Sequence, residues 1–292
     1  MSEKKLRLGV PKGSLQEATI KLFEKSGWKI RTHARNYFPD IDDPEIKCSL
    51  ARAQEMATYV QNGTFDVGLT GKDWVLEWDA DVVVVDDLVY SKVSNKPARW
   101  VLCVKGDSPY KRPEDLDGCK ISTELVGFTK KYFKELGVNV DVSFSWGTTE
   151  AKVVEGLCDA IVEITETGTT IKANGLRVIA ELMQTNTQLI ANKDAWNDPF
   201  KRRKIENINL LLQGALKADR MVGLKMNMPK AKLEELNGSL PALNSPTVAE
   251  LRDPAWVSVE IIVEESVVRE LIPNLVATGA EGIIEYPLNK VI

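Results

Sequence analysis

Strand-like and helix-like patterns of apolar residues take turns along most of the chain. A short apolar run, "LRLGV" at 6–10, is typical of a strand, and residues 14–27 follow with apolar residues at helical spacing behind an S-x-x-E capping box. A second predicted helix at 52–63 leads into the strand "DVGLTG" at 66–71. Segments that alternate in this way predict an α/β protein with largely parallel sheets.

The pattern restarts near residues 95–97, where a second α/β unit begins. In this unit the strand-like runs "GCKIST", "VDVSFSW" and "DAIVEI" alternate with helical segments. The chain then crosses back near 180–190, and a basic helix at 199–220 is predicted to close the first lobe. We therefore expect two lobes, the first made of residues 1–95 and 186–217 and the second of residues 96–185.

The pattern changes again after Arg220. Six segments there follow the order β-α-β-β-α-β, which is the pattern of a ferredoxin-like module of about 70 residues. The predicted fold is thus α/β, with a two-lobed core and a ferredoxin-like domain at 218–292.

Charge and composition exclude several classes of protein. The net charge of −4 argues against a general nucleic-acid surface, which is expected to be basic. The run Lys201–Lys204 is interpreted as a solvated helix face. His33 is the only histidine, so a histidine-ligated metal site or a histidine-based catalytic triad is nearly excluded. The four cysteines form no C-x-x-C pair, which indicates reduced thiols and a reducing compartment.

Neither a secretory signal nor a membrane span is visible. The basic N-terminal segment has only residues 6–10 as an apolar run before Pro11, and no run approaches the roughly 18 apolar residues of a membrane span. We expect a soluble, cytoplasmic protein without membrane or nucleic-acid partners.

The stretch "VEITETGTTIKANG" at 162–175 carries the first candidate chemistry. A helix entered through Thr-Gly-Thr-Thr offers backbone amides and hydroxyls that suit a phosphate, and Gly168 permits close approach. Glu163 would repel that phosphate unless it binds another part of the same ligand. A ribose phosphate fits both, with Glu163 and Glu150 accepting hydrogen bonds from ribose hydroxyls. The alternative is a threonine-rich cap beside solvated acids.

Three stretches of the first lobe, each at the end of a predicted strand or the start of a predicted helix, have similar chemistry. They contain Lys12 and Gly13 in "VPKGSL", Arg52 and Gln54 in "LARAQEM", and Gly71 in "LTGKDW". Because ligands bind at strand ends of open α/β sheets, these stretches predict a cleft.

The motifs "PKGSL", "ARAQEMATYVQNGTFDVGLTGKDW", "GTTEAKVVEGLCDAIVEITETGTTIKANGL", "SPTVAEL" and "DPAWVSVEIIV" occur in an order that resembles the long form of ATP phosphoribosyltransferase, the first enzyme of histidine biosynthesis. The resemblance covers nearly the whole chain, and the second and third motifs are the specific ones. It implies a core like type II periplasmic binding proteins with an ACT-like regulatory domain. The implied reaction joins ATP to phosphoribosyl pyrophosphate with Mg²⁺, giving phosphoribosyl-ATP and pyrophosphate.

The resemblance also implies roles for individual residues. Glu150 and Glu163 would be the catalytic residues, holding the ribose hydroxyls of the sugar donor. Its 5′-phosphate would be cradled by Thr167, Gly168, Thr169 and Thr170. ATP or pyrophosphate would face Lys12, Gly13, Arg52, Gln54 and Gly71. Mg²⁺ is expected to bind through substrate phosphates and water rather than protein ligands.

In the last domain, Asn227, Thr247 and Gly282 match positions that bind the feedback inhibitor histidine. This likeness implies an inhibitor pocket between neighbouring subunits, and hence a homo-oligomer between dimer and hexamer. Without it, ordinary turn chemistry accounts for these three residues.

Two positions depart from the family pattern. Many relatives have aspartate at the position of Glu163, one methylene shorter, which bears on the ribose geometry. Many have arginine at the position of Ser14, which puts a phosphate contact there in doubt.

Two other functions use the same features. A solute-binding or effector-sensing protein shares the two-lobed scaffold, although the signal peptide or DNA-binding helix-turn-helix that usually accompanies it is not visible. A different phosphoribosyltransferase or nucleotide-binding enzyme is the second alternative, since "VEITETGTT" loosely resembles the common phosphoribosyltransferase fingerprint.

Overall fold

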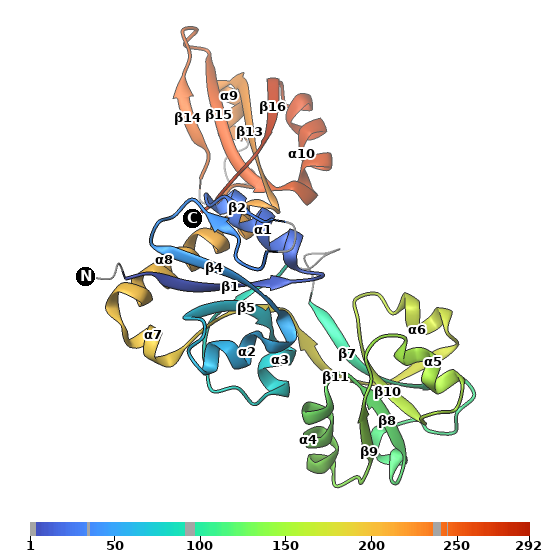
Figure 1. The fold of residues 1–292 in the computed structure, drawn as a ribbon. Coiled ribbons are helices and arrows are strands. Elements are labelled where there is room, and N and C mark those ends of the chain that lie inside the picture. Colours follow the sequence, from blue (N-terminus) through green and yellow to red (C-terminus); the bar gives the residue numbers. More distant parts are fainter. Residues whose placement is uncertain (1–3, 34–35, 91–96, 236–240, 244) are drawn as a thin grey trace. The chain divides into compact units, whose positions relative to one another are not determined.

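The computed structural model describes residues 4–33, 36–90, 97–235, 241–243 and 245–292 (Figure 1). The chain divides into two compact units, one holding residues 1–24 and 28–209 and the other residues 25–27 and 210–292. The expected boundary between the lobes at residues 95 and 96 lies outside the described residues, and the other expected domain bounds stay predictions.

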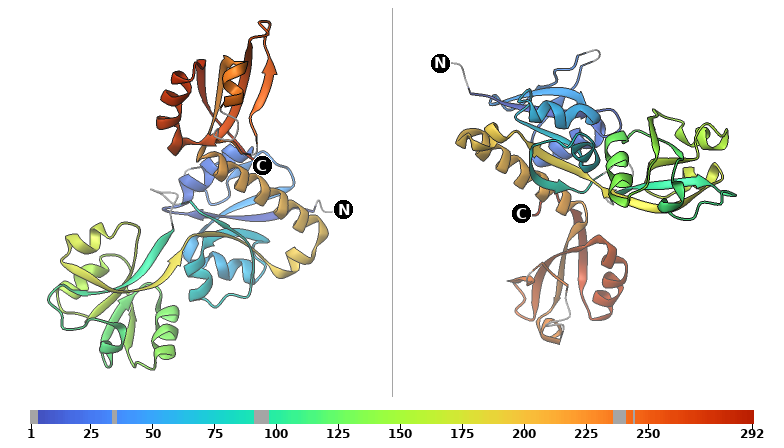
Figure 2. Two further views of the ribbon diagram at one scale, coloured as in Figure 1. Left: turned by 180° about the vertical axis from the view of Figure 1, so that it is seen from behind. Right: turned by 90° about the horizontal axis from the view of Figure 1, so that it is seen from below.

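The first lobe is built on a five-stranded sheet. In sheet order its strands are β4 (Ile46–Arg52), β1 (Leu6–Lys12), β5 (Val67–Gly71), β12 (Thr187–Ala191) and β6 (Val83–Leu88). The helices of this lobe are α1 (Gln16–Ser26), α2 (Ala53–Gln61), α3 (Lys72–Glu77), α7 (Lys193–Asn197) and α8 (Pro199–Ala218), with a small ribbon of β2 (Ile30–Arg31) and β3 (Asp40–Ile41). α2 and α8 lie on opposite faces of the sheet (Figures 1 and 2), which is why its central strands are apolar on both sides.

The second lobe has a five-stranded sheet of its own. Its strands, in sheet order, are β11 (Leu176–Thr185), β7 (Ala98–Lys105), β10 (Ala160–Thr165), β8 (Lys120–Thr123) and β9 (Asp141–Phe144). The helices are α4 (Val126–Leu136), α5 (Thr149–Val154) and α6 (Thr169–Ala173), with a 3₁₀ turn at Pro113–Leu116. Trp100, Leu102 and Phe133 are buried in the core of this lobe.

The two sheets share one strand order. In the first sheet the parallel strands β4, β1 and β5 are followed by β12, which arrives from the other lobe, and then by β6. In the second sheet β9, β8 and β10 are the parallel strands, followed by the arriving strand β7 and then by β11. The arriving strand is β12 in the first lobe and β7 in the second, and each is antiparallel to both of its neighbours. This order is that of type II periplasmic binding proteins, so the predicted fold of the core is confirmed.

The second unit is a ferredoxin-like domain. Its elements are β13 (Met221–Pro229), α9 (Lys230–Glu235), β14 (Thr247–Glu250), β15 (Trp256–Glu264), α10 (Glu265–Ala277) and β16 (Glu281–Pro287), and the strands lie in the order β14-β15-β13-β16. Alternate residues of β13 and β15 are buried, as the period of a strand requires when helices cover one face. The predicted β-α-β-β-α-β order is therefore confirmed.

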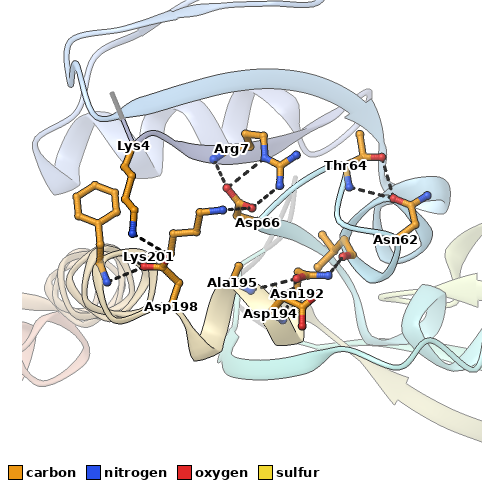
Figure 3. A network of polar contacts seen from close by, with 12 residues as sticks. Lys4, Arg7, Asn62, Thr64, Asp66, Asn192, Asp194, Ala195, Asp198 and Lys201 are labelled. Atoms are coloured by element: carbon orange, nitrogen blue, oxygen red, sulfur yellow. Dashed lines mark hydrogen bonds and ion pairs between the residues drawn. The ribbon is translucent and has the colours of Figure 1, made fainter. Parts of the chain in front are cut away.

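A buried carboxylate joins three elements at the edge of the first-lobe sheet where β1 begins (Figure 3). Asp66, 1% exposed, accepts hydrogen bonds from the Arg7 amide at 2.8 Å, from Arg7 Nη2 at 2.6 Å and from Lys201 Nζ at 2.9 Å. The interpretation of Lys201–Lys204 as a solvated face is thus wrong for two of its members. Lys201 bonds to Asp66, and Lys204 lies 2.8 Å from an Asp43 oxygen, because both point from α8 toward acids of the lobe.

The structure bears on the state of the cysteines and on membrane-spanning helices. All four cysteines are buried free thiols, in agreement with the predicted reduced state. Among the described residues, no helix has both the length and the apolar character that a membrane crossing requires.

Candidate active site

A cavity of about 380 Å³ lies between the two lobes, at the ends of the first-lobe strands. All five residues predicted to face ATP or pyrophosphate line it, namely Lys12, Gly13, Arg52, Gln54 and Gly71. β1, β4 and β5 are parallel, so their carboxyl ends meet at one edge, and Lys12 pairs with Arg52 in register. Ile164 and Glu166 line the cavity from the second lobe.

Local geometry explains two of the glycines. Gly13 has φ +111°, a value that side-chain-bearing residues rarely adopt, and it leads from β1 toward α1. At Gly71, a Cβ atom would lie 2.0 Å from Asp73 Oδ1, so only glycine leaves room for that carboxylate.

Asp73, which was not predicted, connects the first lobe to the second. Its carboxylate accepts a 2.8 Å hydrogen bond from Trp100 Nε1 on β7, and its amide donates to Thr185 Oγ1 at the end of β11. Burial raises the pKa of Asp73, although these hydrogen bonds partly offset the effect. One buried acid therefore contacts both strands at which the chain passes between the lobes.

Glu77, also not predicted, makes a second contact between the lobes. Its two carboxylate oxygens accept hydrogen bonds from the amides of Gly127 and Phe128, each at 2.8 Å, at the start of α4. The negative charge also suits the positive end of that helix. A Cβ on Gly127 would lie 2.8 Å from the Glu77 carbonyl oxygen, so the close approach depends on glycine.

Two acids of the second lobe contribute to the raised pKa of a third. Burial raises the pKa of Glu163 to about 7, and the charges of Glu150 and Glu124 add to the rise, while hydrogen bonds from Ile164 and Thr149 offset part of it. Burial likewise raises the pKa of Glu124, which accepts a hydrogen bond from the Gln54 side chain. Carboxylates gathered in this way favour a ligand that donates hydrogen bonds, such as a sugar. Glu124 was not among the predicted residues.

The predicted phosphate-binding turn is an open loop of hydroxyls. The Gly168 amide donates to Thr165 Oγ1 at 2.8 Å, and the hydroxyls of Thr167 and Thr169 are 2.8 Å apart. Gly168 has φ +76°, and a Cβ added to it would meet no described atom within 4 Å, so its backbone conformation, rather than space, requires glycine. Thr167, Thr169 and Thr170 are exposed.

The predicted residues are not all in one cavity. Glu150, Glu163 and the 167–170 loop do not line the 380 Å³ cavity, although Ile164 and Glu166, between Glu163 and the loop, do. Within the described residues, no three His, Cys, Asp or Glu side chains are placed to hold a metal ion.

The three residues predicted to bind histidine do not all lie on adjacent strands. Asn227 on β13 pairs with Glu281, the neighbour of Gly282 on β16. Thr247 lies on β14, which β15 separates from β13. Thr247 is level with Lys225, two residues from Asn227, so at about 4.8 Å per strand and about 3.3 Å per residue the two are about 12 Å apart within one chain.

Comparison with known proteins adds the family. Two family models match, ATP phosphoribosyltransferase (HisG) over residues 52–214 and the HisG C-terminal domain over residues 218–290. The ATP phosphoribosyltransferase of Solidesulfovibrio magneticus is 70% identical over 287 residues, 98% of each chain. That of Nitratidesulfovibrio vulgaris strain Miyazaki F is 67% identical over the same shares.

A solved structure supports the fold of the core. A chain of the ATP phosphoribosyl transferase (HisG:HisZ) complex from Thermotoga maritima matches with a TM-score of 0.63 at 25% identity, covering 73% of this chain and 98% of that one. This match and the full-length relatives agree on the family of the chain. The chain belongs to the ATP phosphoribosyltransferase family, in its long form with a C-terminal domain, and the family's reaction is the first step of histidine biosynthesis.

Proposed function

We propose that the chain binds ATP and phosphoribosyl pyrophosphate between its two lobes and transfers the phosphoribosyl group to N1 of ATP. The observation that carries this assignment is the 380 Å³ cavity, where Lys12, Arg52 and Gln54 face the strand that bears Glu163. The basic side chains suit phosphates, and Glu166 lines the cavity from the second lobe, next to the strand that carries Glu163.

The proposed mechanism needs no strong base. N1 of adenine is a neutral nucleophile, and the barrier arises as the bond between ribose C1 and pyrophosphate breaks. Positive charge builds on the ribose, and the carboxylates of Glu163 and Glu150 stabilise it because they are held in place beforehand. The amides and hydroxyls of Thr167–Thr170 hold the 5′-phosphate and so fix the position of the sugar.

Mg²⁺ is the metal we assign to this reaction. We expect it to bind through substrate phosphates and water, the mode that Mg²⁺ favours over all-protein ligand sets. Bound in this way, Mg²⁺ would neutralise charge on the departing pyrophosphate.

The assignment is tested by mixing the protein with ATP, Mg²⁺ and phosphoribosyl pyrophosphate. We expect the ultraviolet change of an N1-substituted adenine. Chelation of the metal should remove at least 90% of the rate, because the charge on the phosphates is then unshielded. A tenfold loss of rate corresponds to about 1.4 kcal/mol in the activation free energy. ATP and Mg²⁺ without the sugar donor serve as the blank. No product with all three components would overturn the assignment.

We also propose that the enzyme is a cytoplasmic homo-oligomer, between dimer and hexamer, that free histidine inhibits. Asn227 and Gly282 lie on adjacent strands, whereas Thr247 is on the opposite outer strand of the same sheet. This separation of Thr247 from the other two residues supports a pocket to which neighbouring subunits contribute different members of the three.

Free histidine is expected to lower the rate at saturating substrates. Replacing Asn227 by alanine should raise the half-inhibiting histidine concentration about tenfold to a hundredfold, because a hydrogen bond to a charged ligand contributes about 1.5–3 kcal/mol. Rates of the wild type and of Asn227→Ala are measured across a histidine titration. Insensitivity of the wild-type enzyme would contradict the pocket while leaving the catalytic assignment intact.

A further inference from the structure

The short helix α3 of the first lobe contacts the second lobe along its whole length. Asp73 and Glu77 are four residues apart, so they lie on the same face of this helix. Trp74, beside Asp73, packs against the hydrophobic core of the second lobe. Both ends of α3 therefore take part in the contact between the lobes, but they do so in different places.

The first residues of α3 are fixed where the chain crosses between the lobes. The Lys72 amide donates to the Asn186 carbonyl oxygen at 3.0 Å, in the junction between β11 and β12. The Asp73 amide donates to Thr185 Oγ1, and its carboxylate accepts from Trp100 Nε1. A rotation of one lobe against the other about the crossing strands displaces these atoms least, as at any hinge.

The last residue of α3, Glu77, lies away from that crossing. Four residues separate it from Asp73, which is about 6 Å along the helix axis. Its two carboxylate oxygens accept hydrogen bonds from the amides of Gly127 and Phe128, each at 2.8 Å. A contact away from a hinge restrains the angle between two lobes more than a contact at the hinge, because the same rotation displaces its atoms further.

The start of α4 depends on the other lobe for its cap. The first amides of a helix have no partner within the helix, and a polar side chain just before it usually accepts hydrogen bonds from the second or third of them. In this chain the residue before α4 is Leu125, whose side chain has no polar atom. Gly127 and Phe128 are the second and third residues of α4, so Glu77 does for this helix what a local cap usually does.

The two helices also approach each other closely. A Cβ atom on Gly127 would lie 2.8 Å from the Glu77 carbonyl oxygen, so a side chain there would push α3 and α4 apart. An ion pair between Asp79 and Lys131 joins the same two parts of the chain at 3.9 Å, but these side chains are 93% and 65% exposed. Water screens such a pair, so it adds little to the restraint that Glu77 provides.

We propose that Glu77 is a positioning residue, which holds the two lobes at the angle that the reaction requires by capping α4 of the opposite lobe. This inference rests on the proposed function, in which residues of both lobes bind the substrates. Without the cap the lobes separate more easily, and Lys12 and Arg52 move away from Glu163. A smaller fraction of the enzyme is then competent, so the use of both substrates falls by one common factor.

The first test measures kcat/KM for each substrate while the other is saturating. In Glu77→Ala both values are expected to fall by the same factor, about twofold to thirtyfold, which is the range for loss of a helix-capping side chain. Glu77→Gln keeps one acceptor oxygen and should recover part of the loss. Glu135→Ala is the control, because Glu135 is an exposed acid near the other end of α4, and it should equal the wild type.

Gly127→Ala changes the same contact from the second lobe. Alanine is a better helix former than glycine, so α4 itself should form at least as well in this variant. The added Cβ meets the Glu77 carbonyl oxygen, however, and the two helices must move apart. We therefore expect a common fall in kcat/KM for both substrates here too, although the methyl group carries no chemistry of its own.

Hydrogen exchange gives a readout that does not depend on activity. Glu77 protects the amides of Gly127 and Phe128, so a peptide spanning residues 124–130 should exchange faster in Glu77→Ala than in the wild type. The same peptide in Glu135→Ala should exchange at the wild-type rate.

The outcomes separate this inference from the proposed function. If the wild type forms no phosphoribosyl-ATP, the proposed function fails, and the role of Glu77 in it fails too. If the wild type is active, a common loss in Glu77→Ala and Gly127→Ala with faster exchange in Glu77→Ala supports the inference.

Two results with an active wild type would overturn it. Unchanged kcat/KM values in both variants would show that the cap does not affect the reaction. A loss in Glu77→Ala for one substrate only, which Gly127→Ala does not share, would instead show that Glu77 contacts that substrate directly, since its side chain also borders a cavity between the lobes.

Discussion

Replacing Glu163 by glutamine should lower turnover about a hundredfold to a thousandfold, the usual effect of removing one preorganised electrostatic group from an active site. Glutamine keeps the shape of the side chain and a hydrogen-bond acceptor but lacks the negative charge that the proposed mechanism sets beside the ribose. The rate of phosphoribosyl-ATP formation at saturating substrates measures the loss. Unchanged steady-state rates would remove Glu163 from the mechanism.

The same variant should be more stable than the wild type at pH 8. Burial first, and then the Glu150 charge, raise the pKa of Glu163 to about 7 in the folded protein, from an ordinary value of 4.5. Ionising it therefore reduces stability as the pH rises from below 4.5 through 7. Removing the charge should raise the free energy of unfolding by about 1–2 kcal/mol after allowance for partial exposure, as urea denaturation would show. Below pH 4 the difference should disappear.

The pH profile of kcat/KM provides a control on the role of the charge. If ionised Glu163 is the active form, the acid limb lies near pH 7 in the wild type. Glu150→Gln removes a neighbouring negative charge and so lowers the pKa of Glu163, which should move the limb to lower pH. A limb that stays in place would show that another group controls it.

Replacing Asp66 by asparagine should reduce the free energy of unfolding by about 3 kcal/mol without altering either KM. Asp66 is buried and accepts from Arg7 and Lys201, and removing one member of a buried ionic network typically costs about 3–5 kcal/mol. We use the lower end because Arg7 is partly exposed. The Asp66 network (Figure 3) lies where β1 and β5 begin, whereas Lys12 and Gly71 are the last residues of these strands.

Asp81→Asn is the matched control for this stability measurement. Asp81 forms an ion pair with Lys193 in the same lobe, but both side chains are more than half exposed, so the loss should stay below about 1 kcal/mol. Burial alone would raise the pKa of Asp66, but hydrogen bonds from Arg7 and Lys201 outweigh it, and the pKa is lowered. The stability due to this charge is therefore complete above the ordinary pKa of about 3.9 and is lost as pH falls through the lower folded value. A gap between wild type and Asp66→Asn that widened in acid would contradict this account.

Strand ends were the predictable part of the site. Lys12, Arg52 and Gly71 follow strands whose apolar patterns are clear, and parallel strands bring such residues to one edge. The contacts between lobes were not predictable in the same way. Glu77 caps a helix 50 residues later in the chain, and Asp73 accepts from a tryptophan 27 residues later, and neither pair has a local signature.

The two errors of interpretation have the same origin. Lys201 and Lys204 form part of a charge run that is usually solvated, but their partners, Asp66 and Asp43, lie more than 130 residues earlier. Glu124 was overlooked because it follows β8 without a recognisable motif. A pattern along the chain shows which element a residue occupies, but it does not show which distant side chain that residue meets.

The two-lobed scaffold and the loop at Glu163–Thr170 do not by themselves identify the function. Solute-binding proteins use the same two-lobed topology, and other phosphoribosyltransferases use acid-then-threonine loops, because one fold accommodates many sites. Similarity along 98% of the chain to relatives of one activity supplied the distinction.

The exchange of strands between the sheets bears on how the protein is made. β12 lies between β5 and β6, yet it is synthesised after every strand of the other lobe. On the ribosome the N-terminal lobe must remain incomplete, with a gap in the middle of its sheet, until residue 191 has emerged. The usual order, in which the N-terminal part folds first, is thereby reversed, and a nascent chain that stalls near residue 180 would leave that lobe open to aggregation.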